Sequence, residues 1–327
     1  MDFDLTDDQK EIKRVAKELL ADRSPFAKVR QAAESGEYDD SLWRELCELG
    51  WPGIAVAEEH GGQGLGAVEL AVLLEELGYA CAATPFLSTA VAAAVIQAAG
   101  TTEQQARWLP GLASGETTAG IGTSELVADG AGAAVVVLID GNDAVLVAAP
   151  EAQTLESIDS TRRFATVNGD GEPLAAHAVD RVYAAISAEI VGICQRALDM
   201  TLEYVKERKQ FGVPVGSFQA VSHRCAQMLL HTESARSTAY YAAWAADADA
   251  DRLSEAAALA AAASADGGRE VTASAIQAHG GIGFTWEADV HWLYKRAQLD
   301  AAMLGGSRRH REALARSAAS RVAASAR

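Results

Sequence analysis

Aromatic and basic residues are scarce in this 327-residue sequence. Phe, Trp and Tyr account for 6% of the chain, whereas hydrophobic residues account for 49% and alanine is abundant among them. Small side chains let helices approach closely, so this composition favours a mainly α fold over sheets filled with aromatic rings. Lys and Arg number 28 against 45 Asp and Glu, for a net charge of -17. Because that charge repels a phosphate backbone, and no block of Lys or Arg offsets it, we expect no nucleic-acid binding.

The sequence also lacks the features of secreted, zinc-binding and membrane-spanning proteins. Its first eight residues are rich in Asp, where a signal peptide is basic and then apolar. The longest apolar run, 90–99, is interrupted by Gln97 and is shorter than the ~20 residues that span a bilayer. We therefore expect a cytoplasmic protein that does not enter a membrane. Its cysteines are far apart and outside any CxxC pair, which indicates neither a disulfide framework nor a zinc site: Cys47, Cys81, Cys194 and Cys225.

Helical periodicity dominates residues 1–118. Thr6 is placed to cap a helix whose apolar positions include Ile12, Val15 and Leu19. A glycine-rich stretch, 58–66, resembles a dinucleotide-binding loop, but no β-strand precedes it as that fingerprint requires. We interpret it as a turn between helices. The other helices predicted in this part cover 41–49, 68–77, 85–99 and 102–112.

Residues 119–181 have a different pattern. Two β-branched runs lie within 135–147 around a Gly-Asn turn, and a further strand is predicted at 164–169. About sixty residues allow a few short strands and no large barrel. We expect a small β domain here.

Long helices return in residues 182–327. The connections between them are short, as at 211–217 and 280–285, so the helices are expected to form an antiparallel bundle. The overall prediction is a mainly α fold with a small β domain, divided at 1–118, 119–181 and 182–327. The helices predicted in the last part cover 184–206, 218–248, 253–278 and 287–304, with a final one running through Ala319.

Two helix ends in the last part carry candidate binding residues. At the first, Arg208 and Lys209 lie where a long helix ends, and they either cap the helix or present Arg208 to a diphosphate. The second, 275–284, ends in glycines that either simply terminate the helix or expose backbone N–H groups to a phosphate.

Together and in this order, these segments resemble the acyl-CoA dehydrogenase family. The family's C-terminal bundle carries an Arg-x-x-Phe-Gly turn, a Phe-Gln pair and a Gln-x-x-Gly-Gly-x-Gly helix end, which are matched at 208–212, 218–219 and 277–283. Residues 42–51, 58–64 and 74–78 resemble its N-terminal helical domain. The resemblance implies FAD held between subunits, with its adenine and diphosphate end on the bundle. The residues implied for that end are Arg208, Gln210, Phe211, Phe218, Gln219, Gln277, His279, Gly280 and Gly281.

The middle of the chain departs from the family pattern. The family's β domain presents two segments to the flavin ring, of which 123–130 faintly resembles the first. The second needs a tryptophan, and none occurs between Trp108 and Trp244. The departure implies that this chain does not hold a flavin ring alone.

The family's catalytic base is also missing. Dehydrogenation of an acyl thioester needs a carboxylate to remove the α-proton, and the two family positions for it align with Val182 and Gly305. Glu189 lies two turns further along the same predicted helix, about 10 Å from Val182 at 1.5 Å per residue. No catalytic residue is therefore assigned, and Glu189 is either a substitute base or a structural residue.

These departures resemble the shortened, non-catalytic subunits of heterotetrameric family members from bacteria that degrade steroid side chains. The resemblance implies an α2β2 assembly with a catalytic partner, which together dehydrogenates an acyl-CoA, possibly a steroid side-chain ester, and passes electrons to an acceptor. Two alternatives stay open. The chain is a self-sufficient homo-oligomeric dehydrogenase that uses Glu189, or it is a flavin-free scaffold.

Two further groups of polar residues stand out in the sequence. His223 and His231 are eight residues apart on one predicted helix but lack a third ligand, so no metal site is expected. Arg308, Arg309 and Arg311 begin the last helix, where the helix dipole disfavours positive charge. Three interpretations of these arginines stay open: they contact CoA phosphates, they contact an acidic partner surface, or they are solvated.

Overall fold

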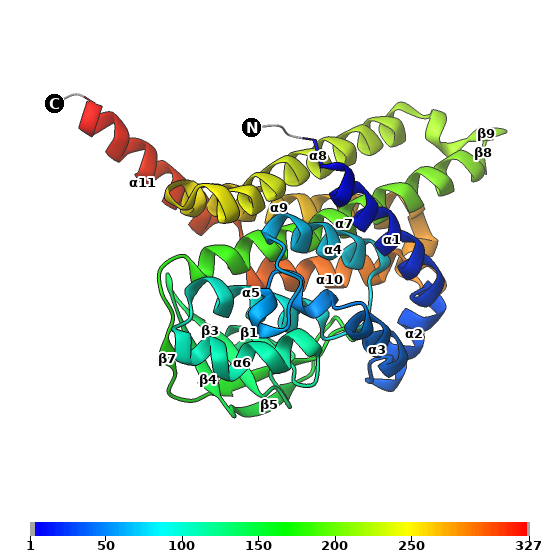
Figure 1. Cartoon of the computed structure of the whole chain (residues 1–327). Coiled ribbons are helices and arrows are strands. Elements are labelled where there is room, and N and C mark those ends of the chain that lie inside the picture. Colours follow the sequence, from blue (N-terminus) through cyan, green and yellow to red (C-terminus); the bar gives the residue numbers. More distant parts are fainter. Residues whose placement is uncertain (1–3, 326–327) are drawn as a thin grey trace.

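The computed structural model describes residues 4–325 of the chain. Helices account for most of it, with one small sheet on one side (Figure 1). The expected mainly α fold with a small β part is therefore confirmed. Within the described residues, no helix combines the length and apolar character that a bilayer crossing demands. The four cysteines all have free thiols.

Six helices form the N-terminal part. At the start of the first, Thr6 accepts a hydrogen bond from the Gln9 backbone, and the Gln9 side chain accepts one from Thr6 N. This reciprocal capping box confirms the predicted cap. The helices are α1 (Asp7–Arg23), α2 (Phe26–Ser35), α3 (Asp40–Glu48), α4 (Ala67–Ala80), α5 (Phe86–Ala99) and α6 (Thr102–Ser114).

The glycine-rich stretch before α4 is a turn, as predicted. Only two short 3-10 helices, η1 (Trp51–Gly53) and η2 (Glu58–His60), lie between α3 and α4. Because no strand leads into the glycines, the stretch lacks the strand-to-helix geometry of a dinucleotide-binding loop.

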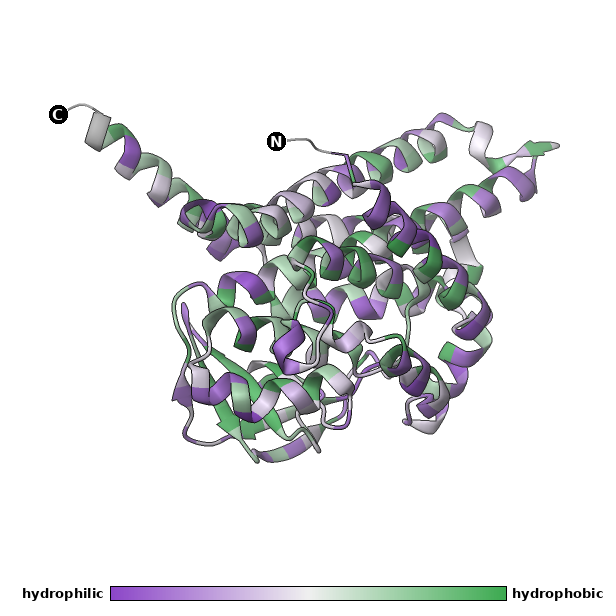
Figure 2. Ribbon diagram, in the orientation of Figure 1, coloured by the Kyte–Doolittle hydropathy of each residue, from purple (hydrophilic) through white to green (hydrophobic). Residues whose placement is uncertain are grey.

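The sheet has seven strands in the order β5-β6-β2-β1-β3-β4-β7, more strands than the few predicted. The β3–β4 hairpin and β6 confirm the two predicted strand regions. Side chains alternate along β3: Val135 and Val137 join the helical core, whereas Val136 packs in a second apolar cluster with Val127 and Val167. Hydrophobic residues accordingly predominate in the central strands of the sheet, which are largely green in Figure 2. The strands are β1 (Ala119–Thr123), β2 (Leu126–Ala128), β3 (Val135–Asp140), β4 (Asp143–Ala148), β5 (Glu151–Leu155), β6 (Phe164–Asn168) and β7 (Glu172–Pro173).

Five helices form the C-terminal bundle, and the first three are 30 residues long. The first begins at Ala178, six residues before the predicted start, because Val179, Val182 and Tyr183 continue its buried face. The 280–285 connection is a 3-10 helix, η4 (Gly280–Phe284). The last helix projects away from the body (Figure 1). The five are α7 (Ala178–Glu207), α8 (Gln219–Ala248), α9 (Ala250–His279), α10 (Val290–Met303) and α11 (Ser307–Ser325).

Helix α7 packs directly against α4 through glycine. A Cβ added to Gly192 of α7 would lie 1.8 Å from Glu75 O, and one added to Gly78 of α4 would lie 2.2 Å from Glu189 O. Only glycine permits backbones to approach this closely. The backbones of α4 and α7 are thus in direct contact at these two glycines.

Candidate cofactor-binding site

A small hairpin follows the end of α7. Strands β8 (Lys209–Gln210) and β9 (Val213–Pro214) pair around a two-residue turn of Phe211 and Gly212. Both turn residues have positive φ, 52° and 83°, as in the tight turns that join short antiparallel strands. Glycine adopts this conformation freely, whereas phenylalanine does so at a cost. The hairpin extends past the neighbouring helix ends (Figure 1).

The candidate binding groups on this hairpin are open to solvent. Phe211 is 93% exposed, and its ring meets that of Phe218 edge to face at 6.3 Å. The exposed Arg208 guanidinium has no hydrogen bond or ion pair with any residue in the described part of the chain. The Gln210 side-chain amide donates to Lys209 O at 2.9 Å, and Gln219 is exposed at the start of α8. The exposed Phe211 ring on its strained backbone and the free Arg208 guanidinium together form a surface that is suited to binding a ligand or partner.

The second predicted segment is fixed against the first by a ring stack. His279, at the end of α9, stacks on Tyr204 at 4.5 Å, and Tyr204 lies one turn before Arg208 on α7. The His279 Nδ1–H donates to Ala275 O at 2.8 Å. Burial lowers the pKa of His279, which favours a neutral ring. Tyr204 lies outside the motifs that mark the candidate residues in the sequence, although its position four residues before Arg208 places it on the same helix face.

The glycines after His279 leave their backbone uncovered. Gly280 has φ +65°, and a Cβ added there or at Gly281 would meet no heavy atom of the described residues within 4 Å. Gln277 is exposed and lines a pocket of about 450 Å³ whose wall also includes Phe284 and Trp286. A diphosphate that binds at this helix end requires backbone N–H groups that are accessible in this way.

Neither family base position carries a carboxylate. Val182 is fully buried on α7. Gly305 follows α10 with φ +73°, and a Cβ there would lie 2.8 Å from Arg309 Cδ. A side chain at Gly305 would require both a strained backbone and a displaced Arg309.

Glu189 lies in a buried ion cluster. Its Oε1 accepts hydrogen bonds from Arg162 Nη2 at 2.5 Å and from Arg296 Nη1 at 3.2 Å, and the side chain is 3% exposed. Arg162 also donates to Asp300 at 2.6 Å, and Arg296 to Asp159 at 2.8 Å. The cluster joins the segment between β5 and β6 to α7 and α10. This geometry supports the structural reading of Glu189 more than the substitute-base reading.

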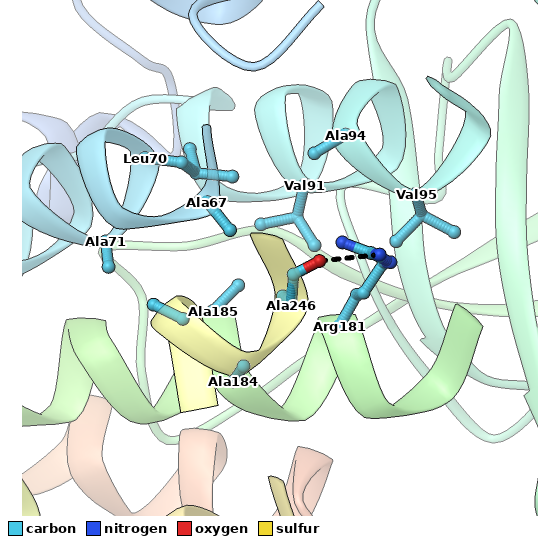
Figure 3. Close-up of a pocket in the computed structure, with 11 residues that line it drawn as sticks. Ala67, Leu70, Ala71, Val91, Ala94, Val95, Arg181, Ala184, Ala185 and Ala246 are labelled. Carbon is cyan, nitrogen blue, oxygen red and sulfur yellow. Dashed lines mark hydrogen bonds between the residues drawn. The ribbon is translucent and has the colours of Figure 1, made fainter. Parts of the chain in front are cut away.

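The helical interior offers little room for an acyl chain where α4, α5, α7 and α8 meet. The cavity there measures about 30 Å³, enough for about two waters. Arg181 crosses it to donate to Ala246 O at 2.9 Å, and alanines on four helices form much of the wall (Figure 3). Across residues 4–325, no group of three His, Cys, Asp or Glu side chains is arranged to hold a metal.

Comparison with known proteins places these features in a family. Residues 6–116 match the acyl-CoA dehydrogenase N-terminal domain, and residues 169–319 match the acyl-CoA dehydrogenase C-terminal domain. Acyl-CoA dehydrogenase IpdE2 of Mycolicibacterium smegmatis is 36% identical over 315 residues, which covers 92% of this chain and 96% of that protein. IpdE2 of Mycobacterium tuberculosis is also 36% identical, over 299 residues, with 89% of this chain and 91% of that protein covered.

Solved structures give the same assignment. The Tcur3481-Tcur3483 steroid ACAD G363A variant has a TM-score of 0.88 at 28% identity, over 97% of this chain and 99% of that one. A chain of the ChsE4-ChsE5 complex from Mycobacterium tuberculosis has a TM-score of 0.84 at 25% identity, over 98% of this chain and 99% of that one. With both terminal domains matched and relatives aligned over nearly its whole length, this chain belongs to the acyl-CoA dehydrogenase family.

Proposed function

We propose that this chain is the shortened, non-catalytic subunit of a heteromeric, FAD-dependent acyl-CoA dehydrogenase, and that it clamps the adenine and diphosphate end of the cofactor. The observation that carries the proposal is the pairing of an unpartnered, exposed Arg208 with a strained, exposed Phe211 on one hairpin. Neither feature benefits the isolated chain, and both suit a bound ligand.

The residues present fit the diphosphate end of FAD. A guanidinium at Arg208 offers paired donors that match phosphate oxygens and stays charged. The uncovered backbone of Gly280 and Gly281 offers further donors without steric obstruction. Gln277 and Gln219 add exposed amides, while Phe211 and Phe218 supply an aromatic surface for a planar ring.

The same residues do not supply the chemistry. When bound, FAD accepts the hydride from the β-carbon of the acyl thioester, while a protein carboxylate takes the α-proton. Val182 and Gly305 offer no carboxylate, and the β domain proposed for 119–181 lacks the tryptophan segment that faces the ring in the family. The proton-accepting group and the ring-binding surface are therefore assigned to a partner chain.

The proposed assembly is an α2β2 heterotetramer of this chain with a catalytic subunit. Its proposed substrate is an acyl-CoA, with a steroid side-chain ester as one candidate, and its electrons pass to an acceptor. One structural relative is a steroid ACAD and another is part of a named complex, which supports both points. The cytoplasm is the proposed compartment, because four unpaired thiols suit a reducing environment.

Co-purification tests the proposal. Co-expression with neighbouring genes, followed by mass and flavin measurement, should give one FAD per pair of unlike chains. Arg208→Ala and Gln277→Ala should each lower the flavin content of the complex. Arg308→Ala is the matched control, because Arg308 is 93% exposed, forms an ion pair with Glu312 and lies outside the proposed clamp.

Two alternatives predict different results. A self-sufficient homo-oligomer, with Glu189 as the base, would purify alone with stoichiometric flavin and turn over substrate. A flavin-free scaffold would keep the flavin content of the complex unchanged in Arg208→Ala and Gln277→Ala. Either result would overturn the clamp proposal.

A further inference from the structure

A pocket of about 360 Å³ lies where the end of α1 and the start of α2 meet the end of α4 and the middle of α7 (Figure 1). This volume suits a small metabolite. The pocket is separate from the FAD clamp, because Arg196 of its wall lies about three turns before Arg208 along α7, about 18 Å at 1.5 Å per residue. The polar residues of the wall are Lys17, Ser24, Glu76, Tyr79 and Arg196.

Arg196 presents a guanidinium whose donors are mostly unused. Its guanidinium carbon lies 5.2 Å from the centre of the Phe26 ring and 5.1 Å from the centre of the Tyr79 ring. These cation–π contacts use the face of the guanidinium and leave the N–H groups at its edge available. One of them donates to Tyr79 Oη at 3.4 Å, and no carboxylate of residues 4–325 forms an ion pair with Arg196. The rings therefore orient the cation without neutralising it.

The acidic residue closest to Arg196 in the sequence has other partners. Asp199, one turn further along α7, accepts hydrogen bonds from Tyr79 Oη at 3.0 Å and from Gln195 Nε2 at 2.9 Å. Both of these donors lie outside the guanidinium. Asp199 thus helps to hold the Tyr79 ring in place and leaves Arg196 without a counter-ion.

Lys17 is a second cation of the wall without an ion pair in the described part of the chain. Its Nζ lies 5.6 Å from the centre of the Tyr79 ring. Glu76 lines the same wall, but its Oε1 lies 3.6 Å from the ammonium group of Lys13, which offsets its charge. Burial also raises the pKa of Glu76, although Lys13 and Lys17 oppose the shift. The pocket is therefore cationic, in a chain whose net charge is -17.

Ser24 adds an unused hydroxyl to this wall. The residue is 6% exposed, and its hydroxyl forms no hydrogen bond with any residue among 4–325. It lies directly before the start of α2, where Pro25 is the N-cap and no side chain caps the helix. The first N–H groups of α2 consequently lack a side-chain acceptor as well. An anion at this point would satisfy both the hydroxyl and the helix start.

We infer that this pocket binds a small organic anion, whose phosphate or carboxylate group accepts hydrogen bonds from Arg196, Lys17 and Ser24. The apolar part of the ligand lies along Leu20 and Ala21, which complete the wall on α1. The bound anion connects α1, α2 and α7, so it stabilises the packing of the N-terminal helices on the bundle. This inference does not depend on the FAD clamp.

Calorimetric titration of the full chain, alone or in its complex, tests the inference with inorganic phosphate and benzoate as probes. Sodium chloride keeps the ionic strength constant, since salt screens contacts between charges. At least one probe should bind, and the one that binds identifies the anionic group. Arg196→Ala should raise its Kd by about tenfold or more, as expected for a lost charged hydrogen bond. Lys17→Ala should raise it by about threefold, because this side chain is exposed.

Arg14→Ala is the matched control for charge. Arg14 lies on α1 like Lys17, but its guanidinium pairs with Glu11 and Glu18 and is not part of the wall. The Kd of this variant should stay within about twofold of wild type. Absence of binding by both probes overturns the inference, and so does a Kd that rises as much in Arg14→Ala as in Arg196→Ala.

Ser24→Ala separates ligand binding from structural support, because it leaves Arg196 and the two rings beside it in place. Removing a hydroxyl that has no partner should leave Tm without the anion unchanged, and should reduce the Tm increase that the anion produces. A lower Tm without the anion together with an unchanged anion effect would assign the hydroxyl to the fold and refute its role as a ligand contact. Arg208→Ala should not alter anion affinity, so failure of the FAD clamp and failure of this site are distinguishable.

Discussion

Tyr204 and His279 stack with their ring centroids 4.5 Å apart and their planes within 20°. The stack joins the last turn of α7 to the last turn of α9, two helix ends that lie far apart in the sequence. Arg208 follows Tyr204 by one turn, and Gly280 follows His279 directly. A single aromatic contact thus links the two segments proposed to hold the cofactor diphosphate.

The first prediction concerns this stack. Tyr204→Ala should lower the FAD content of the complex, because losing the stack, worth about 0.5–1.5 kcal/mol beyond buried area, frees the end of α9. Tyr204→Phe keeps the ring and should retain flavin. Flavin absorbance per mole of purified complex measures both variants. Equal flavin content in Tyr204→Ala and wild type would show that the stack does not position the clamp.

The second prediction concerns the buried ion cluster. Arg162→Ala should destabilise the protein by about 3–5 kcal/mol, because it leaves Glu189 and Asp300 buried without their shared partner. The matched control is Arg163→Ala, since Arg163 is exposed and its guanidinium lies outside the cluster, where it donates to Gly36 O at 3.2 Å and covers the Tyr38 ring. Urea unfolding followed by circular dichroism measures the difference. Similar effects of the two substitutions would mean that the cluster contributes little to stability.

Local sequence patterns predicted the elements, but not this cluster. Thr6 and Gln9 are three residues apart, and the alternation along 135–140 lies within one strand, so each signal is contained in a short window. Glu189, in contrast, meets Arg162 across 27 residues and Arg296 across 107. A buried carboxylate and its distant partners leave no periodic mark in the sequence. Their association depends on how the helices pack.

The sequence likewise predicted some features of the candidate site and not others. The glycines at 280–281 and the Phe-Gly turn at 211–212 were visible as motifs, because special backbone conformations favour particular residue types. The pairing of the arginines at the start of α11 was not visible. Arg308, Arg309 and Arg311 look equivalent in the sequence, and only the helix face on which each lies determines whether an acidic side chain comes within reach, as Glu312 does for Arg308 and Asp266 for Arg311.

The third prediction is a pH dependence that arises from Asp300. Burial, with the nearby charge of Glu189, raises the pKa of Asp300 from 3.8 to about 8, and its Oδ2 has no partner among the described residues. Between about pH 4 and pH 8 the unfolded state releases this proton while the folded state keeps it. The contribution of Asp300 to stability should therefore be greatest below pH 4, fall as pH rises to 8, and stay constant above.

Asp300→Asn tests this dependence, because asparagine keeps the size of the side chain without the proton equilibrium. Between pH 5 and pH 8, the free energy of unfolding of wild type should fall relative to that of Asp300→Asn. Urea unfolding at a series of pH values gives both curves. Parallel curves over this range would mean that Asp300 is already ionised at pH 5 and that the arginines outweigh its burial.

The last prediction concerns the direct contact of α4 and α7. Gly192→Ala should destabilise the protein by about 1–3 kcal/mol, the usual cost of overpacking, because its Cβ would lie 1.8 Å from Glu75 O and the backbones must separate. Gly267→Ala is the control on α9, where the nearest heavy atom to an added Cβ is 3.4 Å away. With room for the methyl group, this substitution should be neutral or stabilise by about 0.5–1 kcal/mol, since alanine favours a helix over glycine. Thermal and urea unfolding measure both variants. A Gly192→Ala protein as stable as wild type would show that α4 and α7 can move apart without loss of packing.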